Sequence, residues 1–172
     1  MEQWTDASWE RYFGLNYRCR LGTLYHRKRE RFFSLCDKWS TAITLIAGSA
    51  AFSRFVTEEV VALLVGLTVV VASMLKLVMG WSDKARAHAV LAQRFIQLDA
   101  TMVAAGPMNA EKLDQFESEL IALDADEPPA LSALVRQCQN ELDRALGKSC
   151  PENSLGFRER IFCHLFDMPK TA

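Results

Sequence analysis

The sequence predicts an all-α membrane protein, with a two-helix transmembrane hairpin continued by long cytoplasmic helices and a small C-terminal helical bundle. Three observations support this class. Two stretches of the 172-residue chain carry no charge, residues 39–53 and residues 60–75. Apolar residues elsewhere recur at spacings of three and four, which is the period of a helix face. No proline occurs between residues 2 and 106, so nothing there removes a helical hydrogen bond.

The stronger transmembrane helix is predicted over residues 60–81. Crossing a hydrocarbon core of roughly 30 Å takes about 20 apolar residues. This stretch meets that length with one charged residue, Lys76, near its end. A lysine in that place can extend its ammonium group to the lipid headgroups.

The other transmembrane helix is predicted over residues 39–56. Its 15 uncharged residues span only about 22 Å as a helix, so it must extend to Val56, with Arg54 reaching outward, and pack on the stronger helix. Residues 57–59 then form a short external turn. The alternative is a soluble protein with a buried central hairpin, because apolar runs of 10 to 14 residues are commonly core helices.

The flanking charges predict the orientation of the hairpin. Residues 1–38 contain eight Lys or Arg, whereas the turn region contains one, Arg54. Positively charged loops stay on the cytoplasmic side, so we expect a multi-pass protein of the inner membrane with both termini in the cytoplasm. The first ten residues lack a basic segment followed by an apolar one, so no cleavable signal peptide is expected.

Residues 1–38 are predicted to form a basic amphipathic helix that begins near Asp6 and continues through the bilayer to about Val56. Its apolar residues recur at helical spacing: Trp9, Phe13, Tyr17, Leu21 and Leu24. Basic residues align on another face: Arg20, Arg27, Arg31 and Lys38. Two interpretations of this basic stripe stay open, a solvated face that contacts anionic lipid and a specific site for an anionic ligand.

Residues 82–106 are predicted to continue the second transmembrane helix into the cytoplasm. They carry two apolar seams, one of small residues that includes Ala85 and Ala92 and one of large residues that includes Leu91 and Phe95. Two seams require two neighbours, and the N-terminal helix is expected to be one of them, in antiparallel orientation. Gly106 and the following proline end the helix.

Residues 107–172 are predicted to form acidic C-terminal helices. Asn109 caps the first, the Asp124–Pro129 segment breaks it, and Gly147 ends the second. Residues 105–147 hold nine acidic and three basic residues, so we expect attraction to the basic N-terminal helix. A last short helix over residues 155–168 closes the bundle or lies on the membrane surface.

No catalytic, cofactor or metal site is apparent in the sequence. It contains no phosphate-binding glycine loop, dinucleotide fingerprint or nucleophile elbow, so we expect no enzyme and no cofactor. The five cysteines form no CxxC pair, and His26, His88 and His164 lack partners at ligand spacing. We interpret His26 and Glu30 as a surface hydrogen bond. A net charge of −1 argues against binding of nucleic acid.

Small and weakly polar residues are the candidate functional positions of the membrane helices. They are Thr44, Gly48 and Ala51 on the first helix, and Ala62, Gly66, Ser73 and Lys76 on the second. One interpretation is helix packing, because small residues let membrane helices approach closely. The other is a water-accessible lining formed when several hairpins assemble. A single hairpin cannot enclose a pore, so conduction requires a homo-oligomer.

Three loose motifs carry a resemblance that covers about residues 10–105. They are Tyr25-His26-x-x-Arg29-x-Arg31, Gly48-Ser49-Ala50-Ala51-Phe52 and Ala85-Arg86-x-His88. With the hairpin and its flanking helices, the chain resembles the bacterial SLATT proteins. The resemblance implies a two-helix membrane effector of nucleotide-second-messenger conflict systems, proposed to form pores that depolarise or lyse an infected cell.

The expected function is therefore a membrane effector that permeabilises the bilayer on oligomerisation, in an anti-phage-type conflict or stress system. Membrane lipid and further copies of the chain are the expected partners. No sensor or synthetase domain is recognised in the sequence, so the trigger is expected to be a separate cytoplasmic protein or a nucleotide second messenger. The alternative is a non-conducting membrane anchor or scaffold that docks a cytoplasmic partner through its helical bundle.

Overall fold

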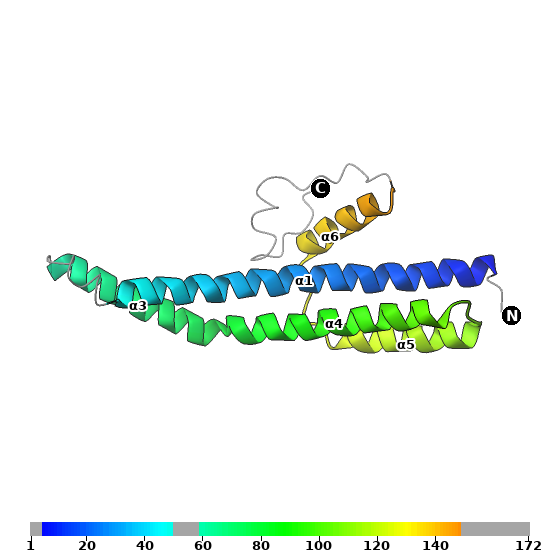
Figure 1. The fold of residues 1–172 in the computed structure, drawn as a ribbon, viewed down its shortest axis with the longest axis horizontal. Coiled ribbons are helices and arrows are strands. Elements are labelled where there is room, and N and C mark those ends of the chain that lie inside the picture. The colour runs from blue at the N-terminus through cyan, green and yellow to red at the C-terminus, as the bar shows by residue number, and fades with distance from the viewer. Residues whose placement is uncertain (1–4, 50–58, 149–172) are drawn as a thin grey trace. The chain divides into compact units, whose positions relative to one another are not determined.

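The computed structural model describes residues 5–49 and 59–148, and every regular element in these ranges is an α-helix (Figure 1). The all-α class is therefore confirmed for the described part of the chain. The helices are α1 (Asp6–Gly48), α3 (Glu59–Met79), α4 (Trp81–Ala105), α5 (Ala110–Ala125) and α6 (Ser132–Ala145).

The chain divides into two compact units. Unit 1 consists of the chain up to Arg29 and from His88 onward, and unit 2 consists of Glu30–Ala87. Unit 1 contains the first half of α1, most of α4, and both α5 and α6. Unit 2 contains the second half of α1, all of α3 and the start of α4.

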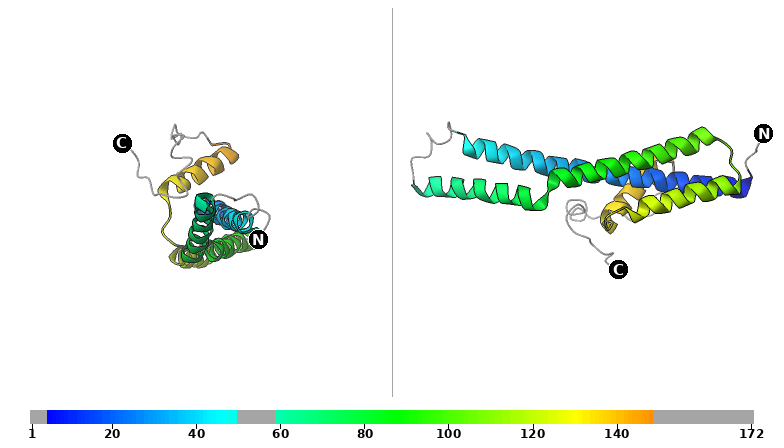
Figure 2. Two further views of the ribbon diagram at one scale, coloured as in Figure 1. Left: turned by 90° about the vertical axis from the view of Figure 1, so that its left-hand side faces the viewer. Right: turned by 90° about the horizontal axis from the view of Figure 1, so that it is seen from below.

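In unit 1, α4 and α5 lie side by side along one flank of α1, and α6 packs on the other flank (Figures 1 and 2). One apolar cluster fills the space between α1, α4 and α5, with Leu15, Cys19, Phe95, Leu98, Met102, Met108, Leu113 and Leu120 buried. A second cluster joins α1 to α6, with Tyr25, Ala133, Leu134 and Cys138 buried. Helix α1 therefore packs against each of the other three helices of the unit.

The buried stripe of α1 differs from the stripe predicted from the sequence. Trp9, expected on the apolar face, is 50% exposed, whereas Leu15, Cys19 and Tyr25 are buried. The reason is that the face against α4 also holds polar residues such as Asn16, whose side-chain amide donates to the Asp99 carboxylate. Leu21 and Leu24 of the predicted stripe are half-buried against the cluster that joins α1 to α6, so apolar periodicity alone finds that side of α1 and misses the side against α4.

The predicted helix ends of unit 1 are confirmed. The Asn109 side chain accepts a hydrogen bond from the Lys112 backbone N–H at 3.0 Å, as an N-cap does. Helix α4 ends at Ala105, and Gly106 follows with a φ of +68°, in the left-handed region that favours glycine. Gly147 has the same role after α6, with a φ of +72°.

Ion pairs connect the basic N-terminal half of α1 to acidic residues of α4, α5 and α6. Nitrogen–oxygen distances are 2.7 Å for Arg11–Asp114, 2.6 Å for Arg18–Asp124, 3.5 Å for Arg20–Asp99 and 2.5 Å for Lys28–Glu141. The expected attraction between the basic and acidic segments is therefore present. Each exposed pair contributes only about 0 to 1 kcal/mol, so the pairs orient the helices more than they stabilise them.

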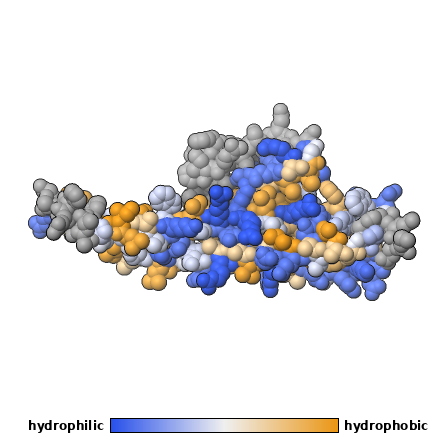
Figure 3. Space-filling model, in the orientation of Figure 1, coloured by the Kyte–Doolittle hydropathy of each residue, from blue (hydrophilic) through white to orange (hydrophobic). Residues whose placement is uncertain are grey.

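Unit 2 is an antiparallel pair formed by the second half of α1 and by α3. The Ser40 hydroxyl donates to the Ala72 carbonyl oxygen at 3.3 Å, and the Lys76 ammonium donates to the Thr41 hydroxyl at 2.7 Å. No residue of α3 is buried. Apolar side chains cover its visible surface (Figure 3). The predicted packing of the two helices against each other is present, and the apolar side chains of α3 are exposed.

One helix in the described part of the chain is long and apolar enough to cross a membrane. It is the run Glu59–Ala105 that α3 and α4 form together, and its most apolar window is not buried at all. Helix α1 carries the start of the other predicted span as far as Gly48. The remainder of that span, the predicted turn and the predicted last helix over residues 155–168 lie outside the described residues.

Two glycines of α1 provide a matched test of the packing in unit 1. A Cβ at Gly22 would lie 3.0 Å from ring carbons of Phe95, whereas a Cβ at Gly14 meets no atom within 4 Å. Alanine gains roughly 0.5–1 kcal/mol over glycine in a helix, but crowding a packed core costs about 1–3 kcal/mol. We expect Gly14→Ala to raise the unfolding temperature and Gly22→Ala to lower it or leave it unchanged. Circular dichroism of the full chain in detergent measures both, and equal stabilisation would contradict the Gly22–Phe95 contact.

Candidate functional site

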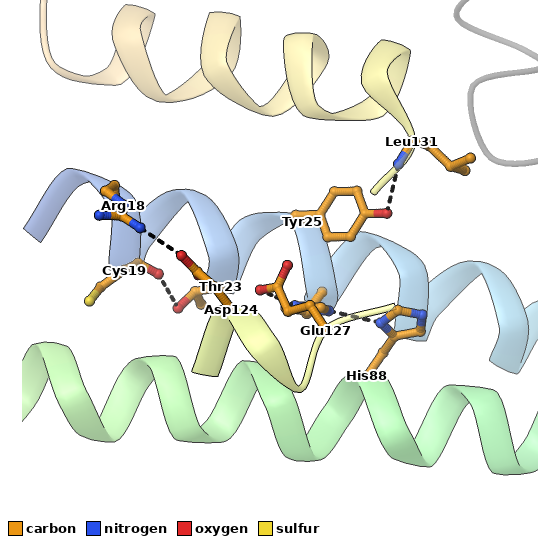
Figure 4. A network of polar contacts seen from close by, with 9 residues as sticks. Arg18, Cys19, Thr23, Tyr25, His88, Asp124, Glu127 and Leu131 are labelled. Carbon is orange, nitrogen blue, oxygen red and sulfur yellow. Dashed lines mark hydrogen bonds and ion pairs between the residues drawn. The ribbon is translucent and has the colours of Figure 1, made fainter. Parts of the chain in front are cut away.

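A buried polar cluster lies at the centre of unit 1, where α1, α4 and the segment after α5 meet (Figure 4). The Nδ1 atoms of His26 and His88 are 2.8 Å apart, and the Nε2 atom of His26 lies 2.9 Å from Oε1 of Glu127. His26 is fully buried and His88 is 5% exposed. Three ionisable side chains far apart in the sequence thus form one continuous chain of hydrogen bonds.

The hydrogen-bonding pattern restricts how many protons the cluster can hold. If the Nε2–H group of His26 donates to the Glu127 carboxylate, a neutral His26 has an acceptor at Nδ1, and Nδ1–H of His88 donates to it. Every contact is then satisfied with both rings neutral. If both rings were cationic, two N–H groups would face each other across 2.8 Å. The cluster therefore excludes the doubly cationic state.

The environment of His88 opposes its protonation. Burial lowers its pKa from the ordinary 6.5 to about 4, with further lowering from the nearby His26 and Arg29. The charged form is disfavoured because a buried imidazolium loses its hydration. His88 is therefore neutral at physiological pH.

Aromatic rings enclose the cluster. The Phe95 ring stacks on His26 with centroids 5.7 Å apart, and the Tyr25 ring contacts His26 edge-on at 5.2 Å. The Tyr25 hydroxyl accepts a hydrogen bond from the Leu131 backbone N–H at 3.2 Å, which ties the cluster to the start of α6. This packing connects the polar centre to all four helices of the unit.

A cavity of about 250 Å³ adjoins the cluster, and its walls include Gly22, Tyr25 and Glu127. Its rim carries the Arg18–Asp124 ion pair. The nearby Cys19 thiol is not a nucleophile at neutral pH, because burial raises its pKa to about 12. Groups of three or more His, Cys, Asp or Glu side chains able to hold a metal are absent from the described residues.

This cluster differs from what the sequence predicts for its histidines. The predicted surface hydrogen bond between His26 and Glu30 is wrong, because His26 is fully buried and bonds instead to His88 and Glu127. These partners lie 62 and 101 residues away along the chain, beyond any local spacing rule. The available signal was that Tyr25, His26 and His88 belong to the first and third of the motifs that carry the family resemblance.

A second group of polar side chains lies in unit 2, where Lys76 faces α1. Its Nζ atom donates to the Thr41 hydroxyl at 2.7 Å and lies 3.5 Å from Oδ1 of Asp37. The structure brings three predicted positions, Thr44, Ser73 and Lys76, around one cavity of about 450 Å³. The lysine charge is therefore partly neutralised within its own hairpin.

The other predicted positions of the membrane helices do not join this group. Ala62 and Gly66 are exposed on α3, and Gly48 is exposed on α1. A Cβ at Gly48 or Gly66 meets no described atom within 4 Å, so neither glycine provides a close approach between α1 and α3. Ala51 lies outside the described residues.

The residues of the predicted basic stripe, Arg20, Arg27, Arg31 and Lys38, are all exposed. Arg20 lies 3.5 Å from the Asp99 carboxylate. This pairing directs one member of the stripe toward α4, so the four residues do not form an uninterrupted anion-binding surface.

The buried histidine pair predicts an acid-sensitive unit 1. The pKa of His88 is near 6.5 in the unfolded chain and about 4 in the folded chain. The stability that depends on neutral His88 is therefore fully present above pH 6.5 and is lost as the pH falls toward 4. The loss is about 3 kcal/mol. NMR titration of the histidine ring resonances of the full chain in detergent checks the pKa.

The variant His88→Gln identifies the His88 resonance by its disappearance. It also removes the corresponding part of the stability loss between pH 6.5 and pH 4. A His88 resonance that titrates near pH 6.5 in the folded protein would contradict the burial argument.

Comparison with models of known protein families, with characterised proteins and with solved structures finds no match. The resemblance to the SLATT proteins therefore stays a prediction.

Proposed function

We propose that this protein is a multi-pass effector of the bacterial inner membrane that permeabilises the bilayer when it assembles into a homo-oligomer. The observation that carries the membrane part of the proposal is the outward-facing apolar surface of α3. This helix has 21 residues, none of them buried, and at about 1.5 Å per residue it matches a hydrocarbon core of roughly 30 Å.

The exposure of individual side chains favours lipid over water around α3. Leu63, Leu77 and Val78 are 72%, 84% and 80% exposed. A soluble protein rarely leaves such a contiguous apolar surface in water. If the helix were the core of a soluble protein, these side chains would be the first to be covered.

The topology of the proposal rests on the charge distribution. With α3 in the bilayer and the basic residues that precede Trp39 on the cytoplasmic side, α1 enters the membrane and a short turn lies outside. Unit 1, with its paired charges, then lies in the cytoplasm together with both termini.

The arrangement of small residues supports assembly. Gly66 is exposed, and space for a Cβ is open there. The exposed Ala62 and Ser73 lie on the same side of α3 by helical spacing. Helices pack closely in membranes through such small residues, so this face is suited to a second hairpin. Several hairpins are the minimum for a pore.

A non-conducting anchor that docks a cytoplasmic partner is the second candidate, and one observation favours it. The Lys76 ammonium is bonded to Thr41 and lies near Asp37 inside its own hairpin. A charge that is satisfied in this way needs no aqueous lumen. In this case the hairpin only locates the helices of unit 1 at the membrane.

The trigger and the biological setting rest on the family resemblance alone. For an effector of a conflict or stress system, a separate cytoplasmic protein or a nucleotide second messenger would act on unit 1. The hairpin would respond by assembling.

Expression of the protein in bacterial cells loaded with a membrane-potential dye tests the proposal. We expect the wild type to collapse the potential and Gly66→Leu to abolish this effect, because leucine blocks close approach at the small-residue face. Val71→Leu is the matched control, since Val71 is 45% exposed on the opposite side of α3 by helical spacing and should keep full activity.

Each other outcome is informative. Membrane-inserted protein that leaves the potential unchanged, with any trigger supplied, would favour the anchor. Equal depolarisation by Gly66→Leu would contradict assembly through this face. Recovery of the protein in the cytosolic fraction, stable without detergent, would contradict both candidates.

A further inference from the structure

The cavity of about 450 Å³ in unit 2 has both charged and apolar walls. It lies between the second half of α1 and the junction of α3 with α4. Its polar wall includes Asp37, Thr41, Ser73, Lys76 and Asp83. Its apolar wall includes Leu45, Leu77 and Trp81.

The polar wall contains a carboxylate oxygen that lacks a donor. Oδ1 of Asp37 is buried and accepts no hydrogen bond from the described residues, although the Lys76 ammonium lies 3.5 Å away. The lysine hydrogen bond goes to Thr41 instead. A carboxylate with a buried oxygen that accepts no hydrogen bond is costly, and the Asp37 side chain as a whole is 27% exposed, so this carboxylate is suited to a ligand that brings an N–H group.

The charges of the cavity are one cation and two carboxylates, Lys76 with Asp37 and Asp83. An anionic ligand would meet a net negative wall. A zwitterion that carries an ammonium and a phosphate matches both signs. The Ser73 hydroxyl adds a donor for phosphate oxygens, whereas the Thr41 hydroxyl already donates to the Asp37 backbone carbonyl at 2.8 Å.

The position of the cavity along α3 fits the level of lipid headgroups, and this step rests on the proposed function. Lys76 and Trp81 mark the cytoplasmic end of the proposed span, and lysine and tryptophan are typical of that boundary. Leu45 and Leu77 are 67% and 84% exposed, so the apolar wall continues into the surface that acyl chains would cover.

We propose that this cavity binds a phospholipid with a primary-ammonium headgroup, of the phosphatidylethanolamine class. The lipid ammonium donates to the Asp37 carboxylate, and the phosphate accepts from Lys76 and the Ser73 hydroxyl. A choline headgroup has the same charges but no N–H donor, so it leaves Asp37 unsatisfied. The site therefore distinguishes lipids by their hydrogen-bond donors and not by net charge.

Native mass spectrometry of the full chain in detergent tests this proposal. The probes are phosphatidylethanolamine, its N-methyl and N,N-dimethyl derivatives, phosphatidylcholine and phosphatidylglycerol with identical acyl chains. We expect binding to weaken as methyl groups replace N–H donors, by about tenfold between ethanolamine and choline, since hydrogen bonds to charged groups are the strong ones. Phosphatidylglycerol is expected to bind more weakly than phosphatidylethanolamine.

If the preference for ethanolamine over choline headgroups arises in the cavity, the variant Asp37→Asn should remove most of that preference. Glu111→Gln is the matched control, an exposed acidic residue on α5 that should keep it. Melting of both variants by circular dichroism verifies folding, and the methylation series tests the site in the wild type even if Asp37→Asn unfolds.

Equal binding of all zwitterionic lipids, or tighter binding of phosphatidylglycerol, would overturn this inference and leave the membrane proposal intact. A chain that needs no detergent and binds no lipid would overturn the membrane proposal itself.

Discussion

Removing the apolar surface of α3 from water is the constraint on which the rest of the interpretation depends. The helix makes few contacts with its own chain, through Ala72 and Lys76 toward α1, and otherwise presents Val and Leu outward. Within the described residues, the hairpin therefore shields polar groups more than apolar ones. Such an inverted arrangement is stable where the surroundings are themselves apolar. The proposed insertion in the bilayer, the proposed assembly and the proposed lipid binding all depend on this one condition.

Unit 1 is organised in the opposite way, around a polar centre inside an apolar core. A buried hydrogen-bond chain contributes specificity when all of its members are satisfied, because any other register of the helices leaves a polar atom without a partner. His26 bonds at both ring nitrogens, to His88 and to Glu127. These contacts determine how α4 and the segment before α6 meet α1. The apolar contacts of Phe95 and Leu98 alone would allow α4 to slide along α1.

Local patterns were sufficient to predict the C-terminal ends of α4 and α6 and the N-cap of α5, but not the left-handed Gly80 (φ +55°) that separates α3 from α4. Asn109, Gly106 and Gly147 act through neighbours within a few residues, so their roles can be read from the sequence. The buried face of α1 and the histidine cluster could not be predicted in this way. The face includes Asn16 and His26, which a search for apolar residues excludes, and the cluster joins residues that only the folded chain brings together. The partial neutralisation of Lys76 by Asp37 also depends on how the hairpin is paired, which composition does not reveal.

Unit 1 contains two kinds of contact that respond differently to salt. One is the set of ion pairs between the first half of α1 and the acidic residues, and the other is the buried centre of histidine and aromatic rings. Arg11, Arg18 and their carboxylate partners are between 41% and 66% exposed, so mobile ions screen them within a Debye length of roughly 8–10 Å at ordinary ionic strength. The histidine–aromatic centre is shielded from such ions. Concentrated salt should therefore loosen the outer attachment of α5 well before it disturbs the interior.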